Sequence, residues 1–110
     1  MKTLSYILYA FIILHFIVAL TEAQATTINV NAPGGGGCDD LVDAINSAST
    51  DSSVGTCTAG SGADIIELAA SSIYMLAVSN NDTNVFGNNG LPVITTTITV
   101  NGNNATIFLL

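Results

Sequence analysis

The pattern of apolar and polar positions predicts one short helix among several strands. In residues 39–49, Leu41, Ala44, Ile45 and Ala48 fall at positions i, i+3, i+4 and i+7, which places them on one side of a helix. Elsewhere, short runs rich in Thr, Ile and Val, which favour strands, alternate with turn residues. The expected strands are residues 26–30, 64–68, 72–78, 94–100 and 105–110. The pattern therefore predicts a mainly β domain with one amphipathic helix.

The clearest two-residue period lies in residues 94–100. Ile94, Ile98 and Val100 are expected to pack on one face, while the threonines between them carry hydroxyls on the other. Segments rich in Gly, Asn and Ser are expected to form the connections, because these residues favour turns. The expected turns and loops are residues 31–37, 50–62, 80–90 and 101–102.

The first 25 residues have the composition of a secretory signal peptide. Lys2 is followed by an apolar run, residues 4–20, and Ala23 and Ala25 form an A-x-A cleavage site. Residues 1–25 are therefore predicted to be a removable helical signal peptide, and residues 26–110 a secreted or cell-surface domain. A transmembrane anchor is the alternative, because a span needs about 20 apolar residues and this run is only slightly shorter. After cleavage, no stable membrane span is expected.

No cationic side chain is left in the predicted mature domain, because Lys2 is the only Lys or Arg and His15 is the only histidine. The domain is acidic, and it lacks the charges that hold a nucleic-acid backbone and the usual histidine base. We expect no nucleic-acid partner, no catalytic residue, and no metal or other cofactor.

Four residues near the predicted helix have structural roles in this interpretation. Cys38 and Cys57 are the only cysteines, and an even pair in an exported chain favours a disulfide. Asp39 and Asp40 precede the helix, where carboxylates accept hydrogen bonds from free backbone amides. We expect both aspartates to cap the helix.

Two sequons offer glycosylation sites at Asn81 and Asn104. In a chain so rich in Asn and Thr, chance occurrence is the alternative. The apolar run 107–110 predicts an exposed strand edge, which natural folds normally cover. We therefore expect a truncated product or a chain that depends on a partner, with marginal stability as an isolated monomer.

Several short motifs follow one another in a defined order. They are Cys38, Leu41-Val42-Asp43-Ala44-Ile45, Gly62-Ala63-Asp64-Ile65-Ile66-Glu67-Leu68, Ile73-Tyr74-Met75-Leu76, Leu91-Pro92-Val93-Ile94 and Thr97-Ile98-Thr99-Val100-Asn101-Gly102. Over nearly the whole mature part, this order resembles the N-terminal segment of secreted right-handed parallel β-helix proteins of pectate-lyase-like fold that carry a CSLREA-type motif. The chain departs from that motif by one extra residue before Leu41 and by Val42 in place of arginine.

The resemblance implies a capping helix that covers the open end of a parallel β-helix, followed by its first coils, as an incomplete fragment. The family implies no single activity, because a fold does not fix a function. Together with the leader, the acidity, the hydroxyl-rich strand faces and the missing basic residues, the resemblance favours a non-catalytic cap module with a structural, adhesive or carbohydrate-associated role. The partners would be extracellular carbohydrate or the remainder of a longer β-helix. The alternative is a fragment of a pectate-lyase-like enzyme that degrades polysaccharide. Such enzymes use calcium held by aspartates and an arginine base, and this chain lacks the arginine.

Two pairs of acidic residues are candidate sites. Asp40 and Asp43 can share a helix face, but two carboxylates are few ligands for calcium. Asp64 and Glu67 lie three apart in an expected strand, so they should face opposite sides rather than form a glycosidase pair.

Overall fold

The computed structural model describes residues 3, 5–7, 23–83 and 87–110. The predicted signal peptide lies mostly outside the described residues. Among those that are described, no helix has the length and apolar character needed to cross a bilayer. The elements of the remaining chain are β1 (Thr27–Val30), α2 (Leu41–Thr50), β2 (Asp64–Leu68), β3 (Ile73–Leu76), β4 (Asn81–Thr83), β5 (Gly87–Asn89), β6 (Ile98–Asn101) and β7 (Thr106–Leu109).

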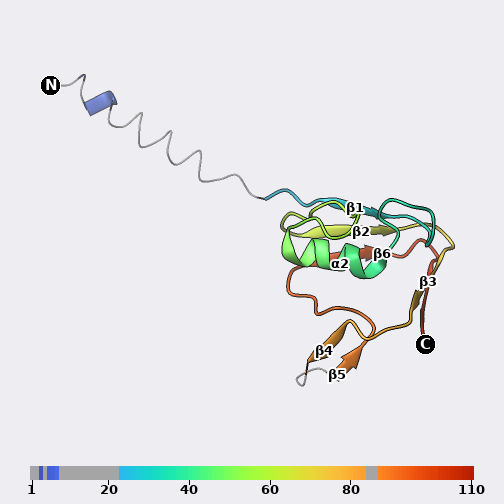
Figure 1. The fold of residues 1–110 in the computed structure, drawn as a ribbon. Coiled ribbons are helices and arrows are strands. Elements are labelled where there is room, and N and C mark those ends of the chain that lie inside the picture. The colour runs from blue at the N-terminus through green and yellow to red at the C-terminus, as the bar shows by residue number, and fades with distance from the viewer. Residues whose placement is uncertain (1–2, 4, 8–22, 84–86) are drawn as a thin grey trace.

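Two parallel sheets form the centre of the fold (Figure 1). The strands β1, β2 and β6 pair in that order, so that Ile28, Ile66 and Val100 lie on one row across the sheet. The second sheet pairs β3 with β7, and places Tyr74 beside Ile107. The prediction of a mainly β domain is confirmed, and both of these sheets are parallel.

The corners that connect the two sheets also lie side by side. The backbone N–H of Ser71 donates to the carbonyl of Asn103 at 3.1 Å, and that of Thr106 donates to Ser72 at 2.8 Å. The chain therefore passes twice along the same path, first through β2 and β3 and then through β6 and β7. Each pass is held to the other by backbone hydrogen bonds at strands and corners alike.

The predicted helix exists, and its apolar stripe is buried. Helix α2 contacts β1, β2 and β6, so it lies across the face of the three-stranded sheet rather than only along the outer edge of β1. Its side chains meet the inward-facing residues of the strands and the two cysteines. The buried core consists of Ile28, Val30, Cys38, Leu41, Ala44, Ile45, Ala48, Cys57, Ile66, Leu68 and Tyr74.

The expected strand over 94–100 is wrong in its first half. Only Ile98–Asn101 is a strand, and Ile94 leaves 51% of its surface exposed. The preceding threonines contact the helix instead, because the Thr95 hydroxyl donates to the carbonyl of Ser49 and the Thr96 hydroxyl to that of Ala48, each at 3.4 Å. The last turn of a helix has carbonyls without intrahelical partners, and these hydroxyls serve two of them.

Two expected turns also differ from the structure. Residues 80–90 contain the antiparallel pair β4 and β5, whose strands are short and polar and carry no apolar alternation. The turn predicted at Asn101 and Gly102 occurs later in the chain. Strand β6 includes Asn101, and the left-handed backbone of the turn is at Asn103 and Asn104. Asparagine tolerates this conformation better than most residues.

Candidate functional site

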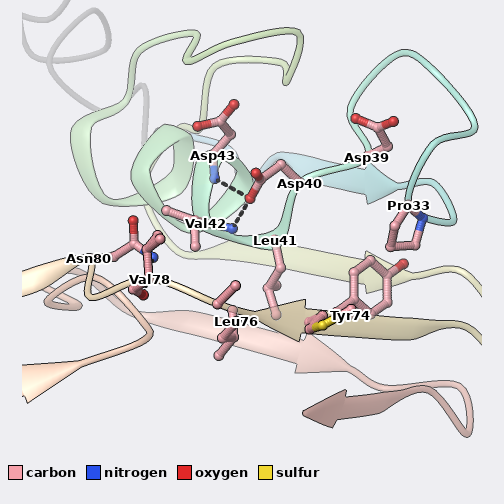
Figure 2. A pocket seen from close by; sticks show the side chains of 12 residues that line it. Pro33, Asp39, Asp40, Leu41, Val42, Asp43, Tyr74, Leu76, Val78 and Asn80 are labelled. Carbon is pink, nitrogen blue, oxygen red and sulfur yellow. Dashed lines mark hydrogen bonds between the residues drawn. The ribbon is translucent and has the colours of Figure 1, made fainter. Parts of the chain in front are cut away.

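A cleft of about 320 Å3 lies between the first turn of α2 and strand β3 (Figure 2). Its apolar side is formed by side chains of the core and of β3. Its other side carries carboxylates from the segment that leads into the helix and from the first helical turn. These groups are Leu41, Tyr74 and Leu76 on the apolar side, and Asp39, Asp40 and Asp43 on the acidic side.

The two adjacent aspartates have different roles. Asp40 is the N-cap of α2, and its Oδ1 accepts hydrogen bonds from the amides of Val42 at 2.7 Å and Asp43 at 3.4 Å. Asp39 does not cap the helix, and that expectation is corrected. Its Oδ2 accepts from the amides of Gly34 and Gly36, each at 3.1 Å, so it closes the glycine turn that follows β1.

The third carboxylate of the cleft belongs to Asp43 in the first turn of α2. A Cβ added at Gly55 would clash with its Oδ2, so the Asp43 side chain is packed against that glycine. In Figure 2, the carboxylates of Asp39 and Asp43 lie on either side of Asp40 and point away from the apolar side chains. Within the described part of the chain, no three His, Cys, Asp or Glu side chains gather as a set of metal ligands.

The disulfide between Cys38 and Cys57 is present, as the sequence predicts. It joins the residue that leads into α2 to the loop that follows the helix, with 4.4 Å between the two Cα atoms. Both cysteines are buried in the core. The bond therefore links the segment before α2 to the loop that follows it.

The acids of β2 lie on opposite sides of the strand, so they form no catalytic pair. Asp64 is buried, whereas Glu67 is partly exposed on the outer face. The side-chain amides of Asn101 and Asn103 donate to the Glu67 carboxylate. These hydrogen bonds, first that of Asn101 and then that of Asn103, lower the pKa of Glu67 below its ordinary value of 4.5, against a smaller opposing effect of burial.

The two sequons lie in different settings. Asn81 begins β4, and its side chain is outside the described part of the structure. Asn104 is exposed at the corner between β6 and β7, with a φ of 58°. An exposed corner is accessible to modification. Glycosylation at Asn104 therefore fits the structure, and it stays a prediction.

The Tyr74 hydroxyl is a central polar contact that sequence reasoning missed. It lies 3.0 Å from the carbonyl of Val30 and 3.1 Å from that of Asn31, and it accepts from the amide of Ala69 at 3.0 Å. A tyrosine in an alternating strand signals burial, but a buried hydroxyl also requires a partner. From the sequence, this requirement predicts that the Tyr74 hydroxyl has a hydrogen-bond partner, but it does not identify the partner.

The chain matches no protein-family model, and neither a curated protein nor a solved structure matches it.

Proposed function

We propose that this chain is the N-terminal cap and first coils of a secreted or cell-surface right-handed parallel β-helix. Its role is structural, adhesive or carbohydrate-associated, and it is non-catalytic. The proposal is supported by the two parallel sheets, which the chain enters in the same order on successive passes. In a solenoid, each coil contacts only its neighbours and contributes one strand to each sheet.

The observation that carries the proposal is a change in exposure along each inward-facing row. Ile66 is fully buried, whereas its neighbour Val100 leaves 44% of its surface exposed. In the second sheet Leu76 is 8% exposed and its neighbour Leu109 is 65% exposed. The rows are therefore buried at β1, β2 and β3 and open at β6 and β7.

An open apolar row of this kind fits a further coil as its partner. The outer edges of β6 and β7 pair with no described strand, so their backbone groups are available for parallel pairing. Another coil would cover Val100 and Leu109 and would also satisfy these backbone groups. We propose the remainder of a longer β-helix as this partner.

The carbohydrate-associated role is supported by a polar row on the outer face of the first sheet. Asn29, Glu67 and Asn101 lie side by side in register across β1, β2 and β6. Asn101 and Asn103 already donate to Glu67. The remaining donor and acceptor atoms of the row, at a strand spacing of about 4.8 Å, can hydrogen-bond to the hydroxyls of one sugar chain. A glycan array with the wild-type chain and Asn29→Ala tests this role, and unchanged binding by the variant would exclude this row.

Catalysis is not part of the proposal. Two of the three carboxylates in the cleft, those of Asp39 and Asp40, are already engaged with backbone amides. Such bonds hold the carboxylate as a structural acceptor rather than leaving it free for proton transfer.

The open face is tested by two matched lysine substitutions in β7. Leu109 lies in register with buried Leu76, whereas Phe108 lies in register with Met75, which is exposed. We expect the wild-type chain to self-associate in light scattering, Leu109→Lys to disperse it, and Phe108→Lys to leave it unchanged. A monodisperse wild-type monomer with a sharp, high thermal transition would contradict the proposal.

A further inference from the structure

The carboxylate of Asp64 is buried at the start of β2, with 1% of the residue exposed. Its Oδ1 accepts from the backbone amides of Ser61 at 2.8 Å and Thr26 at 3.0 Å. Its Oδ2 is also buried, and no described residue donates to it. A buried carboxylate with an unpartnered oxygen is costly unless a cation or further hydrogen bonds compensate.

No side chain of the predicted mature domain can supply that cation. Lys2 and His15 are the only basic residues, and both precede the predicted cleavage site. Once the leader has been removed, the only positive group in residues 26–110 is the new α-amino group. Its position in the fold therefore decides whether Asp64 has a counter-ion.

The predicted cleavage site places this group beside Asp64. The A-x-A sequence ends at Ala25, so the first residue after cleavage is Thr26. Hydrolysis of the Ala25–Thr26 peptide bond consumes one water, leaves a carboxylate on Ala25, and leaves an amine on Thr26 that takes up a proton near neutral pH. The nitrogen that becomes this amine is the one 3.0 Å from Asp64 Oδ1.

The surroundings of Thr26 suit a charged terminus. Residues 23–25 are exposed, which leaves the bond open to a protease, whereas Thr26 itself is partly buried. The carbonyl of Thr26 accepts from the amide of Ile65 at 2.9 Å, so this residue stays in place at the sheet when the leader leaves. An ammonium carries three N–H donors, whereas the peptide nitrogen carries one. The additional donors are available to Asp64 Oδ2.

We propose that removal of the leader at Ala25–Thr26 creates an α-ammonium group whose buried counter-ion is Asp64, and that this ion pair fixes the start of β1 to β2. This inference depends on the export that the proposed function includes. It adds a specific processing position and a role for Asp64 that the cap function does not require.

The experiment uses the full chain expressed in a secreting host, with intact mass and N-terminal sequencing of the product. We expect secreted protein that begins at Thr26. A start at Met1 would overturn both export and the ion pair. A secreted product with any other start would overturn the ion pair alone, so the two failures are distinguishable.

The product that begins at Thr26 contains a single primary amine, because it has no lysine. An amine-acetylating reagent at neutral pH then reports on this group alone. We expect labelling of the wild-type protein to be about tenfold slower than that of Asp64→Asn, because the ion pair keeps the amine in its protonated, non-nucleophilic form. The matched control Asp51→Asn, at an exposed acid, should label as slowly as the wild type.

A second measurement covers the case in which Asp64→Asn does not fold. The labelling rate of the folded wild-type protein is compared with that of the same protein unfolded in urea. We expect protection of about tenfold in the folded state. Equal rates in the two states would overturn the proposal, as would equal rates for the wild type and a folded Asp64→Asn.

Discussion

The hydroxyl of Tyr74 hydrogen-bonds to the carbonyl oxygen of Val30 at 3.0 Å, although the two residues lie 44 positions apart. One is in β3 and the other ends β1, so this contact joins the two parallel sheets across the core. Because the same hydroxyl accepts from Ala69 at 3.0 Å, it also holds the corner between β2 and β3.

Replacing Tyr74 by phenylalanine should therefore destabilise the fold without leaving a cavity. We expect Tyr74→Phe to lower the free energy of unfolding by about 1 kcal/mol, the usual net value of a buried hydrogen-bonding group. Urea unfolding of the variant and the wild type measures the difference. Equal midpoints would show that water replaces the hydroxyl at no cost.

The Glu67 carboxylate should stabilise the fold only when it is ionised. Its pKa is lowered in the folded state, so its contribution is present above the ordinary value of 4.5 and is lost as the pH falls through the lowered value. We expect Glu67→Gln to be less stable than the wild type at pH 7, with the gap closing below 4.5. Chemical unfolding across this pH range measures the gap.

A matched variant identifies the donors. Asn103→Ala removes one of the two side-chain donors to Glu67, so it should reduce the pH-dependent part of the stability without abolishing it. A gap between Glu67→Gln and the wild type that does not change with pH would contradict the assignment.

The end of α2 is a site where stability can be gained. Asp51 adopts a left-handed backbone with a φ of 50°, and its carboxylate lies at the negative end of the helix dipole. Glycine adopts this conformation without strain, so Asp51→Gly should stabilise the chain by about 1 kcal/mol. Thermal and urea unfolding measure the gain. Asp51→Asn removes the charge but keeps a side chain, so it should recover only the electrostatic part.

The disulfide should contribute substantially to so small a core. Cys38 and Cys57 are 19 residues apart, a separation for which the chain-entropy model gives roughly 3 kcal/mol. The double variant Cys38→Ser with Cys57→Ser should lose about this much in unfolding free energy. Native wild-type protein should show no free thiol, and two reactive thiols would contradict the bond.

The helix could be predicted from sequence because its signal is local. Leu41, Ala44, Ile45 and Ala48 repeat at the helical period, and all four are buried. Which aspartate caps the helix was not decidable from position, since two adjacent candidates precede Leu41. The choice depends on the glycine turn, whose amides engage Asp39 and leave Asp40 for the helix.

The remaining differences come from contacts between distant segments. The alternation of residues 94–100 looks uniform, yet Thr95 and Thr96 are drawn to the carbonyls at the end of α2. Likewise, the acids of β2 were visible in the sequence, but the contact of Thr26 with Asp64 arises only from the register between segments 38 residues apart. No periodicity reports such pairings.

The shared register of Ile28, Ile66 and Val100 has a mechanical consequence. In a parallel sheet the hydrogen bonds connect neighbouring strands. A force that pulls an end of β1 or β6 away from β2, across the strands, would break these bonds one after another. Tension along the strands would instead load every bond of a strand at once. We expect this fold to withstand a larger force along its strands than across them.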